Sequence, residues 1–240
     1  MTNMPNLLKI CFGIIASLFV AQFSYAAPSP ALGSNTYEKI EQLKGYCHRM
    51  EGDEGNAKEC IEAKKLAERA LKQDPENVDL LFDYAMMMSF SERSKAVTLL
   101  RKVVVLDPDH GEGLYKLGAY TEGRESVKYL KKAIQLDPNH RWAHYMLAYH
   151  LMELGDGAGA AEAMKNHIKF DFVDTDIITF TNFLQSSGFS SEIPGIFETY
   201  LKSTSDPKSS CIGIDIYWKK YKIKSKSFDK TFKEFCGRKK

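Results

Sequence analysis

The 240-residue sequence lacks an excess of either charge. It contains 33 Lys and Arg residues against 31 Asp and Glu, so its formal net charge at pH 7 is only +2. That balance does not predict nucleic-acid binding, which usually shows as a basic excess. The sequence also lacks a P-loop, a Gly-rich dinucleotide-binding loop, a Gly-x-Ser-x-Gly elbow and a His-Glu-x-x-His motif. These absences favour a non-catalytic protein without a cofactor.

Cysteine is scarce, with five residues, and there is no Cys-x-x-Cys pair or Cys/His cluster. Structural zinc sites usually draw on such spacings, so none is expected. His140 and His144 stand four residues apart on one expected helix, but no motif places a third ligand beside them. A packing position for His144 is the simpler interpretation, and we expect no metal site.

Long hydrophobic runs are rare, and the one that stands out covers residues 10–20 (ICFGIIASLFV). Lys9 precedes it, and Ser24-Tyr25-Ala26 places small residues three and one positions before Ala27. This layout predicts a signal peptide at 1–26 and a flexible leader at 27–35, hence export to the periplasm or secretion. The run is short for a transmembrane helix, although an uncleaved anchor is the alternative.

Four cysteines remain once Cys11 has left with the expected signal, an even number in an exported chain. Helices predicted at 36–51 and after a turn at 52–56 bring Cys47 opposite Cys60. An antiparallel hairpin in the C-terminal segment brings Cys211 opposite Cys236. Of the three pairings, helix geometry therefore favours Cys47–Cys60 and Cys211–Cys236, and reduced buried thiols are the alternative.

Period-two alternation, which marks half-buried strands, is absent from every long stretch. The sequence has instead a recurring helix ending, at Asp74-Pro75, Asp107-Pro108 and Asp137-Pro138, with spacings of 33 and 30 residues. Each pair ends a helix, because the residue before Pro is driven out of the α region. Asn77, Asp109 and Asn139 are expected to cap the helices that follow. Periods of this size are typical of solenoids, and a generic helical bundle is the alternative.

The units resemble the tetratricopeptide repeat (TPR) family, whose 34-residue helix–turn–helix carries small or apolar residues at fixed places. Residues 141–174 match best, through Leu147, Ala148, Leu151, the turn Leu154-Gly155-Asp156, Ala160 and Met164. The preceding unit is four residues shorter than 34, and the unit before that is one residue shorter. A weaker fifth unit ends at Asp206-Pro207. The resemblance implies an all-α, TPR-like helical solenoid of about five helix pairs over 36–207, with a basic C-terminal capping hairpin at 208–240.

The resemblance also implies a concave groove lined by the second, fifth, ninth and twelfth residues of each unit. In this sequence these places supply the predicted partner-binding residues Phe82, Met86, Tyr115, Trp142, Tyr145, Tyr149 and Met152, flanked by Asp79 and Glu112, with Phe183 in the weaker unit. Aromatic and Met side chains are common at interfaces, so a protein or peptide segment is the expected ligand. The Lys and Asn residues with which some family members hold acidic C-terminal peptides are missing here. The alternative is that these aromatics fill space between helices or under the hairpin.

The C-terminal segment is strongly basic, since ten Lys and Arg residues after position 218 face only Asp229 and Glu234. Such a patch suits an anionic surface or an acidic partner. The alternative is the solvated face of a capping helix whose other face carries Phe228, Phe232 and Phe235. We therefore predict an exported, non-catalytic scaffold or adaptor that binds a protein segment in its groove. The second hypothesis is a secreted protein that engages a host or an anionic envelope surface through the basic tail.

Overall fold

The computed structural model describes residues 34–47, 58–89, 91–169, 174–204 and 206–237, and these ranges are built from helices. The α-helices are α1 (Ser34–Lys44), α2 (Lys58–Gln73), α3 (Val78–Met88), α4 (Arg93–Leu106), α5 (Gly111–Tyr120), α6 (Gly123–Leu136), α7 (Arg141–Glu153), α8 (Gly157–His167), α9 (Asp174–Ser186), α10 (Ile193–Ser203), α11 (Pro207–Tyr221) and α12 (Lys226–Cys236). Short 3₁₀ turns, η2 (Gly45–Cys47) and η4 (Ser190–Glu192), follow α1 and precede α10. The all-α prediction is confirmed, and no strand occurs within these ranges.

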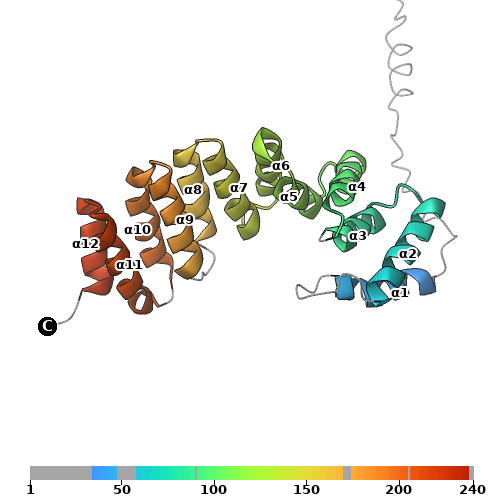
Figure 1. Cartoon of the computed structure of the whole chain (residues 1–240), viewed down its shortest axis with the longest axis horizontal. Helices are drawn as coiled ribbons and strands as arrows, with labels where there is room; N and C mark the ends of the chain where they lie inside the picture. The colour runs from blue at the N-terminus through green and yellow to red at the C-terminus, as the bar shows by residue number, and fades with distance from the viewer. Residues whose placement is uncertain (1–33, 48–57, 90, 170–173, 205, 238–240) are drawn as a thin grey trace, which may run out of the picture.

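The helices follow one another along the long axis of the molecule as a solenoid (Figure 1). Five consecutive pairs, from α1/α2 to α9/α10, precede the α11/α12 hairpin at the C-terminal end. From α1 to α8 and from α9 to α12 each helix packs against the next, and further contacts join α5 to α7 and α8 to α10. Contacts between the same members of successive pairs are what stacked repeats require.

The Asp-Pro steps end helices as predicted: α2, α4 and α6 each stop at the residue before the Asp. The aspartates also shape the turns, because the side chain of Asp107 accepts a hydrogen bond from the Asp109 backbone N–H at 3.1 Å. Asp137 does the same for Asn139 at 2.9 Å. Such side-chain-to-backbone bonds two residues ahead are a regular way in which aspartate stabilises a turn.

The predicted caps are correct in one case of three. Asn77 caps α3, since its side-chain oxygen accepts a hydrogen bond from the Leu80 N–H at 3.0 Å. The caps of α5 and α7 are His110 and His140 rather than Asp109 and Asn139. In each turn the aspartate side chain accepts the backbone N–H of the residue before the histidine. The helix therefore begins one position later than predicted. The imidazole Nδ1 then supplies the acceptor that an Asn or Asp cap would otherwise provide.

Small residues allow the helices to pack closely. A Cβ added at Gly118 of α5 would lie 2.6 Å from Cγ of Leu130 in α6, so only glycine fits there without a shift. Ala133, Ala160 and Met164 are buried at their expected packing positions, as are Leu147, Ala148 and Leu151. Close packing requires small residues at fixed positions of each pair, and this is why the repeat can be recognised in the sequence.

The two cysteine pairs lie at the two ends of the solenoid. The sulfur atoms of Cys47 and Cys60 are 2.03 Å apart, and those of Cys211 and Cys236 are 1.99 Å apart. These are the pairings that helix geometry favours, one beside the first helix pair and one within the last hairpin. The helix expected at 36–51 gives way to the η2 turn after Lys44, and the turn expected at 52–56 lies outside the described residues.

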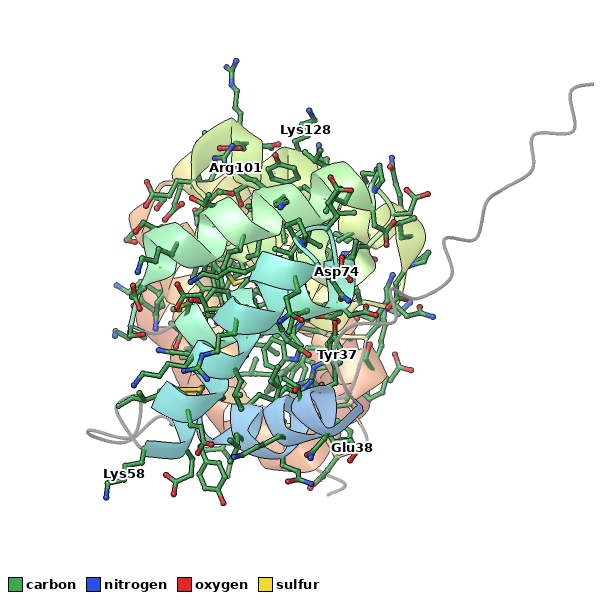
Figure 2. The ribbon with its side chains drawn as sticks, turned by 90° about the vertical axis from the view of Figure 1, so that its right-hand side faces the viewer. Tyr37, Glu38, Lys58, Asp74, Arg101 and Lys128 are labelled. Atoms are coloured by element: carbon green, nitrogen blue, oxygen red, sulfur yellow. A yellow bond between two sulfur atoms is a disulfide. The ribbon has the colours of Figure 1, made fainter. Side chains whose placement is uncertain are left out.

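Viewed from its α1 end, the molecule directs charged side chains such as Lys58, Arg101 and Lys128 outwards (Figure 2). Tyr37 lies instead towards the interior, where its hydroxyl accepts a hydrogen bond from the Asn77 side chain at 2.9 Å. Within the described ranges, no helix is both long and apolar enough to cross a membrane. The expected signal at 1–26 lies outside those ranges.

Candidate partner-binding surface

The first helices of three successive pairs each carry a half-buried aromatic ring that contacts a histidine. Phe82 of α3 lies 4.9 Å from His110 at the start of α5, measured between ring centroids. Tyr115 of α5 lies 4.5 Å from His140 at the start of α7. The same place on α7 holds Tyr145, whose ring is 5.1 Å from His167 at the end of α8. In these three units the fifth residue therefore lies against a histidine of another helix.

The α7 part of this surface is a run of three rings. Trp142 meets Tyr145 edge-on at 5.9 Å, and Tyr145 is 4.9 Å from Tyr149. Tyr149 then stacks on Phe183 of α9 at 6.3 Å. The rings thus continue from one helix pair to the next. We call this surface the aromatic strip, and it consists of Phe82, His110, Tyr115, His140, Trp142, Tyr145, Tyr149 and Phe183.

Of the seven predicted groove residues, five belong to the aromatic strip and two do not. Trp142 is 43% exposed, and the other four aromatic rings are half-buried. Met86 and Met152 are only 7% and 4% exposed and belong to the buried core. Both lie in the last turns of their helices. Met86 shares its buried cluster with Leu100 of α4 and Leu117 of α5, so neighbouring helices enclose this end of α3.

The histidines of the aromatic strip are the residues that the sequence analysis missed. Both His110 and His140 stand two residues after Pro, in Asp-Pro-x-His, and this repeated tetrapeptide is the signal that marks them. His140 uses Nδ1 to accept the Ala143 N–H at 3.1 Å. A neutral ring in that arrangement carries its hydrogen on Nε2, which lies 3.1 Å from a carboxylate oxygen of Glu112. The ring is therefore held at both nitrogens and lies tilted by 47° against the Tyr115 ring.

The charges around the aromatic strip are mixed. Burial, together with the nearby Glu112 carboxylate, raises the pKa of Tyr115 to about 12, so its hydroxyl stays neutral at physiological pH. Lys116 lies over the Tyr115 ring at 4.9 Å, and the Arg141 guanidinium lies over Trp142 at 4.4 Å. Such cations order the rings and screen part of their faces. The strip therefore offers apolar ring surface beside charges of both signs.

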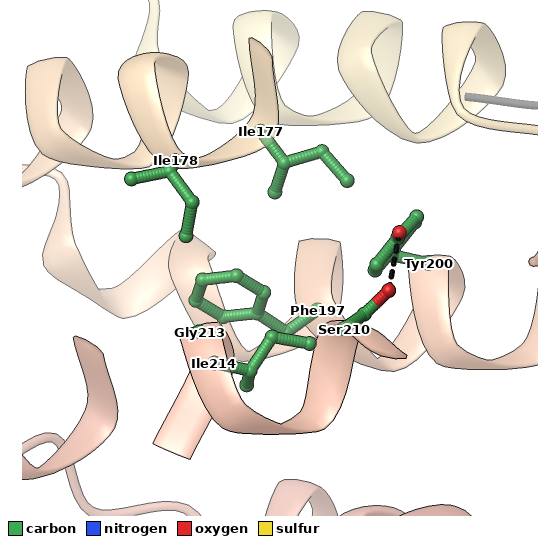
Figure 3. A pocket seen from close by; sticks show the side chains of 7 residues that line it. All are labelled: Ile177, Ile178, Phe197, Tyr200, Ser210, Gly213 and Ile214. Atoms are coloured by element: carbon green, nitrogen blue, oxygen red, sulfur yellow. Dashed lines mark hydrogen bonds between the residues drawn. The ribbon is translucent and has the colours of Figure 1, made fainter. Parts of the chain in front are cut away.

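Two other features do not form ligand sites. A cavity of about 30 Å³ lies between α9, α10 and α11, lined by Ile177, Ile178, Phe197 and Ile214, with room for about one water molecule (Figure 3). At its edge the hydroxyls of Tyr200 and Ser210 lie 2.7 Å apart.

His144 is buried, as its packing position predicts, with Nε2 3.0 Å from the Pro138 carbonyl oxygen. Across the described ranges, no three His, Cys, Asp or Glu side chains gather in a way that would hold a metal ion.

A sequence model of the tetratricopeptide repeat family matches residues 117–177, from α5 to the start of α9. The tetratricopeptide repeat is therefore shown for that part of the chain. A crystal structure of the MamA protein is 22% identical and covers 79% of this chain and 98% of its own, with a TM-score of 0.53. MamA from Desulfovibrio magneticus RS-1, from residue 41 to its end, is 14% identical and covers 72% of this chain and 96% of its own, with a TM-score of 0.54.

PilW, described as a widely conserved type IV pilus biogenesis factor, is 19% identical and covers 72% of this chain and 79% of its own, with a TM-score of 0.53. A search of curated proteins gives no significant match. At these identities the structural likeness shows the repeat fold alone. The role of the aromatic strip is therefore argued from the residues of this chain.

Proposed function

We propose that the protein is an exported, non-catalytic scaffold that holds a protein or peptide segment against the aromatic strip. The observation that carries the proposal is the unbroken series of rings from Trp142 to Phe183, part of which is open to solvent. Tetratricopeptide repeats present their first helices to partners, and the aromatic strip runs along those helices. Trp and Tyr are the residue types that dominate binding energy at interfaces.

Preorganisation supports the same proposal. The Tyr115 ring lies between its histidine and a lysine, and Tyr145 lies between two other rings. A ring that is already ordered loses little conformational entropy when a partner covers it. The mixed charges beside the strip suit a segment with apolar side chains between polar ones, rather than a uniformly charged peptide.

Export is the second part of the proposal. The 1–26 segment has the layout of a signal peptide, and both cysteine pairs are within disulfide distance. Disulfides persist in oxidising compartments, so the periplasm or the extracellular space is the proposed location. In this proposal residues 27–35 form the leader, 36–207 the repeats and 208–240 the capping hairpin.

The decisive experiment places a photo-cross-linking amino acid at Trp142 in the native compartment. The matched control places it at Val105 of α4, which is 75% exposed and outside the aromatic strip. We expect a discrete partner adduct from position 142 that is absent from position 105. Equal labelling from both positions, or labelling from position 105 alone, would remove the aromatic strip as the binding site.

A truncation series then measures the contribution of the rings. Tyr145→Ala with Tyr149→Ala should weaken partner binding about tenfold or more, since one hot-spot aromatic is worth about 2 kcal/mol. Val105→Ala with Leu136→Ala removes exposed apolar surface elsewhere and should leave binding unchanged. Thermal melting of each variant separates lost contacts from lost folding. If the tyrosine variant binds like the wild type and remains folded, the groove proposal is wrong.

The basic tail does not require a partner of its own along most of its length. Phe228 is buried, Phe232 and Phe235 are half-buried, and the lysines of α12 are exposed on its other side. This is the solvated face of a capping helix. Two lysines in the turn before α12 do not belong to that face.

A further inference from the structure

A polar hollow of about 510 Å³ lies where the α9–α10 connection meets the α11–α12 turn. Its lining includes Lys222, Lys224, Ser190, Ser191, Ser225 and Gln185. None of the described residues that line it is acidic, and neither lysine forms an ion pair with a described residue. The lining therefore carries two lysines and no carboxylate, and the acidic residue that adjoins it is Glu192, in the segment between Ser191 and Pro194.

Lys222 holds an unusual backbone conformation. Its φ is +50°, and no other described residue except glycine has a positive φ. This left-handed position follows the end of α11, where glycine or asparagine normally stands because a Cβ makes the conformation costly. A side chain kept in an unfavourable conformation at the edge of a hollow indicates a use for that side chain.

The wall of the hollow offers further donors. Ser190 contributes a hydroxyl group, whereas the Ser191 hydroxyl already donates to the Glu192 carboxylate at 3.5 Å. Ser225 caps α12 by accepting the Phe228 N–H at 3.2 Å, which leaves its own hydrogen free to donate. The next two backbone N–H groups, of Lys226 and Ser227, have no partner within the helix. These two residues do not line the hollow themselves but follow Ser225, which does, at the positive end of the helix dipole, where phosphate groups bind readily.

Gln185 supplies a hydrogen-bond acceptor rather than a donor. Its side-chain oxygen is buried and has no hydrogen-bond partner in the described structure, although it belongs to the lining. A buried acceptor of this kind costs free energy unless a donor reaches it. Because that oxygen has no exposed surface in this conformation, a ligand hydroxyl would meet that need after the Gln185 side chain turns towards the hollow. At this wall the Tyr221 hydroxyl donates to the Asn182 side chain at 2.9 Å and links α11 to α9.

We propose that this hollow binds a phosphate ester of a hydroxylated carrier, such as a glycerol or sugar phosphate. Lys222, Lys224 and the first N–H groups of α12 hold the phosphate oxygens, and a carrier hydroxyl donates to Gln185. The site shares no residue with the aromatic strip, so this proposal can be tested independently of the proposed function. The same chemistry occurs in a free phosphate ester and in a lipid headgroup, and the experiment distinguishes the two sources.

The test titrates glycerol 3-phosphate into the whole mature protein and follows backbone amide signals by NMR. Saturable shifts at Lys226 and Ser227 are expected. Lys222→Gln with Lys224→Gln should weaken binding about tenfold or more, because charge-assisted hydrogen bonds are lost. The matched control, Lys230→Gln with Lys233→Gln, removes equal charge from exposed positions outside the hollow and should change binding less than about twofold.

Two outcomes would overturn the site. One is the absence of saturable shifts at millimolar ligand, and the other is equal weakening by both double variants, which would mean diffuse attraction to the basic tail. Vesicles of phosphatidylglycerol, compared with phosphatidylcholine, decide the source. Vesicle binding that depends on Lys222 and is displaced by glycerol 3-phosphate identifies a headgroup. Binding of the free ester alone identifies a soluble ligand.

Lys222→Gly adds a control against a purely structural role. Glycine accepts the positive φ without strain, so this variant should be at least as thermally stable as the wild type. It should still lose phosphate-ester binding at least about fivefold, because one of the two ammonium groups is gone. A Lys222→Gly protein that binds as well as the wild type would refute the proposal.

Discussion

At the scale of single residues, histidine in Asp-Pro-x-His has two roles in this molecule. His140 caps α7 through Nδ1 and contacts the Tyr115 ring at a tilt, while Nε2 faces Glu112. His110 repeats the cap and meets Phe82. One side chain thus links the start of a helix to the aromatic strip of the preceding unit. Capping and ring contact can be separated by mutation.

We predict that His140→Ala lowers the free energy of unfolding by about 1 kcal/mol, the usual worth of a helix cap. His140→Asn restores the cap without the ring, so it should recover most of the stability while leaving Tyr115 more exposed. Urea unfolding measures the first effect, and the NMR signals of the Tyr115 ring measure the second. An Asn variant as unstable as the Ala variant would show that ring packing, rather than capping, is what stabilises this turn.

Tyr115 also leads to a pH prediction. Its pKa in the folded protein is about 12, above the ordinary value of 10.0, mainly because of burial. The unfolded chain therefore releases this proton first, so the stabilisation is complete below about pH 10 and is lost as the pH rises towards 12. Tyr115→Phe should make stability fall less steeply across that window. Denaturant midpoints at pH 9, 10 and 11 test this, and parallel curves for the two proteins would contradict it.

At the scale of elements, we predict opposite effects on stability when two helical glycines are replaced by alanine. Gly213 in α11 has nothing within 4 Å of an added Cβ, so Gly213→Ala should stabilise the protein by about 0.5–1 kcal/mol. Gly118 in α5 has Leu130 atoms at 2.6 Å, so Gly118→Ala should destabilise it. Thermal melts of the two variants should shift in opposite directions. Shifts of the same sign would mean that helix propensity outweighs interhelical distance here.

The bounds of the elements were largely predictable from the sequence, because local chemistry ends these helices. Pro acts on the residue directly before it, so the ends of α2, α4 and α6 follow from the Asp-Pro steps. The starts of α5 and α7 were misplaced by one residue, because Asp and Asn are common caps and histidine is not. The burial of Met86 and Met152 was not predictable, since it depends on how helices from neighbouring units enclose the ends of α3 and α7.

At the scale of the whole molecule, the disulfides act on ends that lack one neighbour. In a solenoid each unit contacts only adjacent units, so a terminal unit is the first to open. Cys47–Cys60 and Cys211–Cys236 close loops with sequence separations of 13 and 25 residues. Cross-links of this size stabilise by about 3 kcal/mol each in the chain-entropy description.

We predict that each cross-link protects only its own end. Cys47→Ser with Cys60→Ser should speed hydrogen exchange in α1 and α2, while α6 to α8 keep their protection. Cys211→Ser with Cys236→Ser should do the same for α11 and α12. Exchange followed by mass spectrometry resolves the two ends. Loss of protection along the entire chain in either variant would show one cooperative unit instead of a graded solenoid.

The sequence by itself determined the helical class, the repeat period, the cysteine pairing and most rings of the aromatic strip. Each of these depends on neighbours along the chain or on the register of a single helix, so a linear pattern carries it. Tertiary structure alone decided which groove positions are buried and that histidines lie against the rings. It also decided that the α9–α10 connection and the α11–α12 turn share one polar hollow. These features join segments that are separated in sequence, and only the packing angle between helix pairs determines whether such segments meet.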